Sequence, residues 1–242
     1  MLAVAAAALT PGFGWLVLGL AAALAALLGM VAIRPTTATA PSASAAAAGN
    51  FPPSAWRMVL SYGGFGFGYI IPATFLPASA RALIVDPTVF GWIWPIFGLA
   101  AAVSTVLASS LFRQAGPRRL WTVAQLLMAA GVALPALYTS LVTLLLSALV
   151  VGGTFMVVTM SGLQEGRRVG AAAAPRLMAA MTAAFAAGQL LGPLTVGAAG
   201  TAVDAIRTPS LVAAAVLALT ASLLLLGREG RQLHEAVIGK GS

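Results

Sequence analysis

Long apolar stretches alternate with short polar gaps along most of the chain. A hydrocarbon core of ~30 Å requires about 20 helical residues at ~1.5 Å each. Seven stretches reach that length, near residues 13–33, 57–79, 90–112, 119–139, 141–163, 177–202 and 208–227. They are continuous, rich in Ala and Leu, and lack the period-2 alternation of a membrane barrel. The pattern predicts an all-α, polytopic bundle of about seven membrane-spanning helices.

Basic residues favour every second gap. Of the 13 Lys and Arg residues, 11 share one side of the expected topology: Arg34, Arg57, Arg113, Arg118, Arg119, Arg167, Arg168, Arg176, Arg228, Arg231 and Lys240. The other side holds Arg81 and Arg207, near Asp86 and Asp204. Because basic residues near helix ends stay on the cytoplasmic side, we expect the N-terminus outside and the C-terminus in the cytoplasm.

Composition agrees with a lipid environment. Apolar residues make up 60% of the 242 residues, charged residues only 7%, and the mean hydropathy is +1.00. We therefore expect a multi-pass protein of the cell membrane, in a bacterium the inner membrane, with the lipid bilayer as its main partner. The formal charge of +8 follows from the loop arginines and anionic headgroups, so no nucleic-acid partner is expected.

The apolar pattern also divides the chain. We expect an apolar segment with the first helix at 1–33, a flexible cytoplasmic linker at 34–56, a six-helix bundle at 57–227 and a cytoplasmic tail at 228–242. The linker is rich in Pro, Thr, Ala and Ser and buries little apolar surface. The six helices follow with short connections, the tightest expected at Leu137–Ser140, which predicts that sequential helices are antiparallel neighbours.

A cleavable signal peptide over residues 1–45 is the rival interpretation of the N-terminal segment. The small residues around Ser42–Ala45 fit a cleavage site, but the first basic residue is Arg34. A signal peptide carries its basic residues before the apolar region, so we favour a membrane helix.

Three motifs within the six helices carry a family resemblance. They are Gly64–Pro77 (GFGFGYIIPATFLP), Val151–Met156 (VGGTFM), and Met181–Phe185 followed by Gly188–Pro193. In this order they resemble the seventh, tenth and eleventh helices of a major facilitator superfamily transporter of the YbfB/YjiJ-like branch. The resemblance covers residues 13 to about 227 and implies the C-terminal half plus one preceding helix. On this reading the chain is partial, and a second six-helix bundle is an expected partner.

The segment Ser110–Arg119 occupies the position of the family's inner loop signature. Its glycine and paired arginines fit, whereas its acidic residue is missing, which puts a carboxylate-based gating latch in doubt. The resemblance assigns cytoplasmic gating to these basic residues, and anchoring to lipid headgroups is the alternative. The residues concerned are Arg113, Arg118, Arg119, Arg167 and Arg168.

Ionisable residues are expected only outside the spans. The carboxylates are Asp86, Glu165, Asp204, Glu229 and Glu235, and the one histidine is His234. No catalytic set, metal-ligand cluster or cofactor motif is present, and without cysteine there is no thiolate site. We therefore expect neither an enzyme, a metal nor a cofactor.

Uncharged polar and aromatic residues are the remaining candidates for solute binding. We predict Tyr62, Phe65, Tyr69, Thr74, Trp94, Phe155, Thr159 and Gln189. Two alternatives stay open: Trp92, Trp94 and Tyr138 suit the interfacial aromatic belt, and Gln189 suits a structural bond between helices.

Glycine and proline residues within two of the spans suggest hinges or close helix packing. The candidates are Gly64, Gly66, Gly68, Pro72, Gly188, Gly192 and Pro193. Glycine and proline weaken a helix, whereas small residues also let neighbouring helices approach. The sequence does not choose between the two roles.

The resemblance implies a secondary carrier that works by alternating access on a small solute. Because no charge lies in the spans, a neutral, amphipathic or aromatic solute is favoured. The alternatives are a seven-helix receptor and a non-transporting structural protein of the membrane. A retinal protein would need an intramembrane lysine, and the sole lysine is Lys240 in the tail.

Overall fold

The computed structural model describes residues 55–83, 92–169, 173–198 and 207–226, and several residues between 16 and 28. The chain divides into two units, with the boundary between Ala43 and Ser44. In the first unit, the described residues between Leu16 and Leu28 are helical. The predicted linker up to residue 54 and the predicted tail lie outside the described residues.

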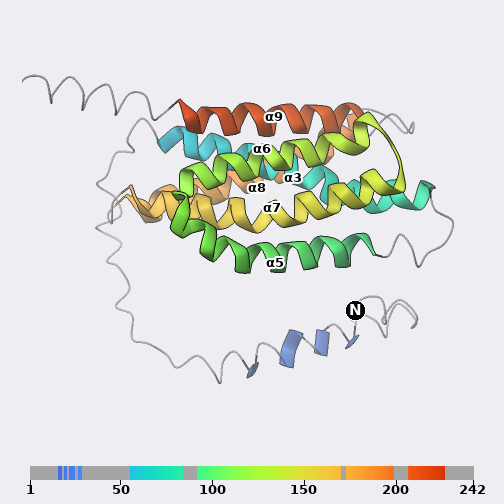
Figure 1. Ribbon diagram of the computed structural model, residues 1–242, viewed down its shortest axis with the longest axis horizontal. Coiled ribbons are helices and arrows are strands. Elements are labelled where there is room, and N and C mark those ends of the chain that lie inside the picture. Colours follow the sequence, from blue (N-terminus) through green and yellow to red (C-terminus); the bar gives the residue numbers. More distant parts are fainter. Residues whose placement is uncertain are drawn as a thin grey trace, which may run out of the picture. The chain divides into compact units, whose positions relative to one another are not determined.

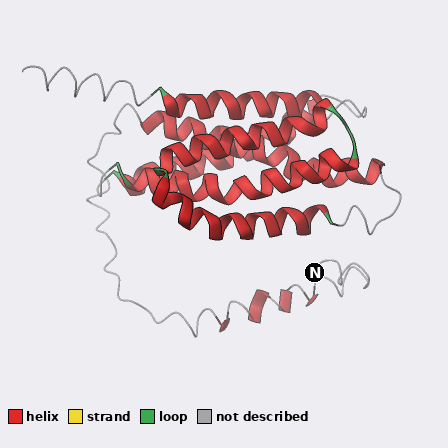
Figure 2. Cartoon of the chain, in the orientation of Figure 1, coloured by secondary structure: helices red, strands yellow, loops and turns green. Residues whose placement is uncertain are grey.

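The second unit contains six helices, and its described residues include no strand (Figures 1 and 2). The helices are α3 (Ala55–Leu83), α5 (Ile93–Gln114), α6 (Pro117–Leu137), α7 (Leu141–Arg167), α8 (Ala174–Ala198) and α9 (Arg207–Leu225). Each overlaps one predicted span. The all-α prediction is confirmed.

Most of these helices are long enough to cross a membrane. Five candidate spans are Ala55–Leu76, Pro117–Leu137, Leu141–Arg167, Ala174–Val196 and Arg207–Leu225. Helix α5 has 22 residues, and its described side chains include the apolar segment Ile93–Ala108. Length and composition thus support a helical membrane bundle.

The helices do not pack in sequence order. Extensive contacts connect them in the row α8, α3, α9, α6, α7, α5, and α3 also contacts α7. Of the sequential pairs only α6 and α7 contact each other extensively, so the prediction that sequential helices are neighbours was wrong for the others. Successive helices do reverse direction (Figure 1). A loop between two helices is enough to reverse the direction of the chain. Whether the two helices then pack against each other depends on which of their side chains fit together.

The contact pattern has an internal symmetry. Exchanging α3, α5 and α6 for α7, α8 and α9 converts the α3–α8 contact into α7–α5 and the α3–α9 contact into α7–α6. The α6–α9 and α3–α7 contacts map onto themselves. Because α3 and α7 run in opposite directions (Figure 1), the six helices form two inverted three-helix repeats.

The tightest connection differs from the predicted one. The shortest described connection is Ala115–Gly116, between α5 and α6, and not the turn before Ser140. Pro117 begins α6 directly after Gly116, where its fixed φ suits a first helical position. At the other end of the bundle, Ser140 caps α7, and its hydroxyl accepts a hydrogen bond from the Thr143 amide at 3.2 Å.

Glu165 lies in the last turn of α7, because this helix continues to Arg167. The prediction had placed this carboxylate in a loop, and the structure corrects it. Glu165 lies 3.9 Å from Arg168, a distance longer than a hydrogen bond, and its side chain is 13% exposed. The acid therefore remains at a helix end, among basic residues.

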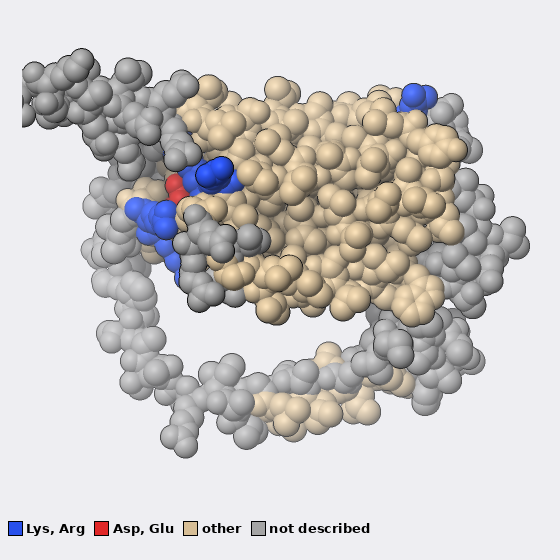
Figure 3. Space-filling view, viewed as in Figure 1, with Lys and Arg blue, Asp and Glu red and all other residues tan. Residues whose placement is uncertain are grey.

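Basic residues gather at one end of the six-helix unit (Figure 3). Because helix direction alternates, the starts of α3, α6 and α8 and the end of α7 share this end (Figure 1). It carries Arg57, Arg118, Arg119, Arg167, Arg168 and Arg176, and we call it the arginine end. The start of α9, with Arg207, lies at the opposite end. Between the two ends, the described surface in Figure 3 shows no Lys, Arg, Asp or Glu.

Candidate functional site

Six aromatic rings from four helices meet inside the bundle. They are Tyr62, Phe65 and Tyr69 of α3, Phe97 of α5, Phe155 of α7 and Phe185 of α8, and we call them the aromatic cluster. The three α3 residues are spaced at i, i+3 and i+7, which places them on one face of the helix. That face meets α7 and α8.

The closest pair of rings lies between α3 and α7. The ring centroids of Tyr69 and Phe155 are 4.4 Å apart, and those of Phe65 and Phe185 are 5.0 Å apart. Phe97 joins the cluster from α5, with its centroid 6.2 Å from that of Tyr69. Such distances are typical of stabilising ring pairs. The Tyr69–Phe97 pair joins α3 and α5, whose backbones approach each other little.

Burial decreases from one end of the cluster to the other. Tyr62 and Phe65 are buried, whereas Tyr69, Phe97 and Phe155 are half-buried. The side chain of Thr159 interacts with the Tyr62 hydroxyl. Among the described residues, no carboxylate, lysine, arginine or histidine belongs to the cluster. It offers an apolar aromatic surface with a few hydroxyl groups and no formal charge.

Three predicted binding residues lie at the edge of this cluster or outside it. The ring of Trp94 is 5.5 Å from that of Phe97, and the Trp94 side chain is 50% exposed. Thr74 is exposed on α3. Gln189 is half-buried on α8 and has no hydrogen-bond partner among the described residues. The structure thus brings together Tyr62, Phe65, Tyr69, Phe155 and Thr159.

Phe97 and Phe185 complete the cluster, although the sequence did not single them out as binding residues. Phe185 lies three and four residues before Gly188 and Gln189, which were both predicted, so helical spacing could have pointed to it. Phe97 follows Trp94 at the same spacing. Both are joined to residues of α3 only by the tertiary structure.

A third missed residue is Gln125 of α6, which is fully buried. Its amide nitrogen donates to the Thr220 hydroxyl at 2.8 Å and to the Leu217 carbonyl at 3.2 Å, both on α9. Its amide oxygen accepts a hydrogen bond from the Trp121 indole at 2.7 Å. The sequence analysis had considered Gln189 for a bond between helices and had not singled out Gln125.

The Gln125 amide joins three helices. It also lies 3.4 Å from the Ser61 carbonyl oxygen of α3, and the Ser61 hydroxyl donates to the Thr220 carbonyl. Trp121 contacts Tyr62 edge to face, with a centroid distance of 5.8 Å, so this polar junction adjoins the aromatic cluster. In lipid, each of these polar groups needs a partner within the bundle.

Glycines bring two helices close to α3. A Cβ atom added at Gly66 would meet the backbone of Phe185 on α8, with the Phe185 Cα at 2.9 Å. Added at Gly64 or Gly68, it would meet Thr220 or Leu217 on α9. Residues 64 and 68 thus face one neighbour and residue 66 faces the other.

The glycines of α8 approach α3 in return. A Cβ atom at Gly188 would meet the Gly63 carbonyl and, at 2.6 Å, the Phe67 amide, and one at Gly192 would meet Ile70. Pro72 lies within the uninterrupted helix α3, and Pro193 lies within α8. These glycines are at close helix contacts, and a hinge at the prolines stays a prediction.

The predicted basic residues are on three helices. Arg118 and Arg119 lie at the start of α6, and Arg167 and Arg168 lie at the end of α7. Arg119, Arg167 and Arg168 are exposed, and Arg118 is half-buried. Arg113 is in the last turn of α5, and its side chain lies outside the described part of the structure.

A family model described as "Uncharacterised MFS-type transporter YbfB" matches residues 1–225. The chain belongs to this family. It is therefore a membrane protein of a transporter family within the major facilitator superfamily, as the three sequence motifs indicated. No curated protein sequence matches the chain.

The inverted repeats agree with membership of this family. Major facilitator transporters contain three-helix inverted repeats within each six-helix half, and their substrates bind near the bilayer midplane. In this MFS-type chain the aromatic cluster lies on α3 and α7, which exchange under the repeat symmetry and contact each other. It is the candidate site because it is central, aromatic and partly accessible.

Proposed function

We propose that this MFS-type protein is a secondary carrier that works by alternating access on a neutral, amphipathic or aromatic solute. The solute contacts the aromatic cluster, above all Tyr69 and Phe155. The half-buried, uncharged cluster is the observation that carries the proposal. A charged solute would lose its hydration there without a counter-charge from the described residues, which is costly in a membrane.

The hydroxyl groups give such a site its selectivity. Tyr62, Tyr69 and Thr159 supply donors or acceptors beside apolar rings, which suits a solute with one or two polar groups. Thr159 already donates to the Phe155 carbonyl at 2.9 Å and also interacts with the buried Tyr62 hydroxyl, so Tyr69 is the freer group. Thr74, Trp94 and Gln189 remain predicted contacts, at the periphery of the cluster or beyond it.

We further propose that a second six-helix bundle forms the opposite wall of the path. Within the six-helix unit, α5 and α8 stand at the two ends of the helix row and make no extensive contact with each other. The half-buried rings of the aromatic cluster lie on α3, α5, α7 and α8. Rocking of two bundles around such a face would expose the solute to each side of the membrane in turn.

Solute binding tests this proposal. In detergent, neutral aromatic and amphipathic solutes are screened by the thermal midpoint of the purified chain, with dicarboxylates as the charged comparison. Y69A and F155A are expected to weaken binding of any hit by about tenfold, because a buried ring contributes roughly 1 kcal/mol or more beyond its area. In vesicles, the chain alone should bind the hit without accumulating it against a gradient.

The matched control is Y138A, because Tyr138 is exposed at the end of α6 and lies outside the cluster. It should bind like the unchanged chain. Equal weakening by Y138A, or hits among dicarboxylates alone, would contradict the assignment of the site. Uphill uptake by the chain alone would contradict the need for a second bundle but not the site.

A further inference from the structure

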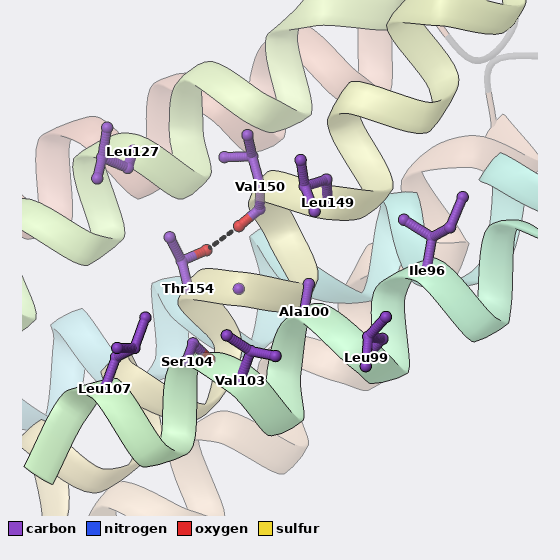
Figure 4. Close-up of a pocket in the computed structure, with 11 residues that line it drawn as sticks. Ile96, Leu99, Ala100, Val103, Ser104, Leu107, Leu127, Leu149, Val150 and Thr154 are labelled. Atoms are coloured by element: carbon purple, nitrogen blue, oxygen red, sulfur yellow. Dashed lines mark hydrogen bonds between the residues drawn. The ribbon is translucent and has the colours of Figure 1, made fainter.

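An apolar groove lies on the flank of the bundle, away from the aromatic cluster. It has a volume of about 610 Å³ and is lined by α5, α6 and α7 (Figure 4). Helices α5 and α6 approach each other little, and α7 forms the floor between them. The volume falls within the roughly 300–1,000 Å³ of ligand pockets. It is large enough to bind part of a small organic molecule.

The groove opens toward the surroundings of the bundle. Leu99, Val103, Leu107, Leu127 and Leu149 line it, and each is at least 49% exposed. At the depth of these spans the surroundings are hydrocarbon. The groove is therefore open to lipid.

Polar groups in the groove are already satisfied. The Thr154 hydroxyl donates to the Val150 carbonyl at 2.7 Å, the bond drawn in Figure 4. The Ser104 hydroxyl donates to the Ala101 carbonyl at 3.0 Å. An occupant gains only apolar contact here, which favours a hydrocarbon chain over a solute that needs hydrogen bonds.

The charged side chains indicate at which end of the bundle the headgroup of such a hydrocarbon chain would lie. Among the described residues of these three helices and their connections, the charged side chains lie at the arginine end, with Arg119 and Arg168 exposed. An Nη atom of Arg168 lies 4.0 Å from the Cβ position of Gly116, in the α5–α6 connection. Arginines from two of the groove-lining helices thus stand beside one connection. Glu165 is the one described acid among them.

The distances along α5 suit a lipid anchored at this end. Leu107 lies seven residues before Gln114, which is about 10 Å along a helix, and Ile96 lies about 16 Å farther. A lipid with its phosphate at the arginine end would place the distal part of an acyl chain in the groove. Basic clusters beside such pockets favour anionic headgroups.

We propose that the groove between α5, α6 and α7 binds an acyl chain of an anionic phospholipid, whose phosphate contacts Arg119 and Arg168. The site is separate from the aromatic cluster and does not depend on the proposed transport activity. It would fill the gap between α5 and α6 with an ordered lipid.

Photolabelling of the full chain in phosphatidylcholine nanodiscs tests this site. The probe is a phosphatidylglycerol with a diazirine in the distal half of one acyl chain, and labelled peptides are located by mass spectrometry. Labels should concentrate on Val103, Leu107 and Leu127. R119Q and R168Q should each lower this labelling about fivefold, as the loss of one basic residue near a membrane surface implies. The same probe on phosphatidylcholine should label weakly.

Two matched controls accompany these variants. R207Q removes an exposed arginine at the opposite end and should leave labelling unchanged. G153L fills the groove, whereas G98L adds the same side chain on α5 at a glycine with nothing within 4 Å of its Cβ position. Groove labelling should fall severalfold in G153L but not in G98L. Equal labelling by the two headgroups, an even spread around the bundle, or an unlabelled groove, as a second protein chain covering it would give, would overturn the proposal.

Discussion

At the scale of single residues, the buried polar side chains matter most. A lipid-embedded bundle has no water to satisfy them, so each partner must come from another helix or its own backbone. Gln125 meets this demand with Thr220, Leu217 and Trp121, whereas Gln189 is half-buried with no described partner. The two glutamines therefore differ in energetic role: Gln125 holds helices together through its hydrogen bonds, and Gln189 makes no such bond with the described residues.

Substituting Gln125 by Leu should destabilise the bundle. Q125L keeps a similar volume but leaves the Trp121 indole without its acceptor, which should lower the free energy of unfolding by about 1–2 kcal/mol. The shift of the thermal midpoint in detergent measures this. Q189L is the control and should change the midpoint little. A Q189L shift as large as that of Q125L would show that the polar junction is not the stabilising one.

At the scale of elements, α3 is held by glycines that point in two directions. Gly66 meets α8, and Gly64 and Gly68 meet α9, so one helix is packed closely on both sides. Small residues at such contacts replace the hydrophobic driving force that helices lack in lipid. The position of α3 fixes Tyr62, Phe65 and Tyr69, and thereby the aromatic cluster.

Alanine at position 66 tests this close packing. Its methyl group would meet the Phe185 backbone, which cannot move aside as a side chain could, and G66A should destabilise by about 1–3 kcal/mol. The thermal midpoint gives the measurement. G98A adds the same methyl group in open space and should be neutral or stabilising by up to about 1 kcal/mol. Equal midpoints for the two variants would contradict the tight α3–α8 contact.

At the scale of the whole molecule, the arginine end defines an orientation. Among the arginines whose side chains the structure describes, six share one end of the six-helix unit, and Arg207 stands at the other. Alternating helix directions bring together residues that are up to 119 positions apart, from Arg57 to Arg176. Because basic residues are retained in the cytoplasm, this end should face the cytoplasm of the cell membrane.

Cysteine labelling in intact cells measures this orientation. The chain contains no cysteine, so G116C and T139C each carry a single reactive group at an exposed position on opposite ends of α6. An impermeant maleimide should label T139C and leave G116C unmodified until the cells are opened. Labelling of G116C from outside would place the arginine end on the wrong side.

The sequence by itself determined the helices, their membrane-spanning length, the position of the arginines and the glycine motifs. These depend on local properties: mean hydropathy, helix rise and charge near helix ends. It also supplied Tyr62, Phe65, Tyr69, Phe155 and Thr159, which lie in or beside the cluster.

Only the tertiary structure decided which helices touch, that Phe97 and Phe185 complete the cluster, that Gln125 rather than Gln189 is the buried amide, and that α5 and α6 leave a groove. The physical reason is the solvent. A helix in lipid is apolar on every side, so its hydrophobic pattern does not indicate the face that packs. The choice of neighbour depends on small residues and on polar groups that find partners, and these pairings span the whole chain.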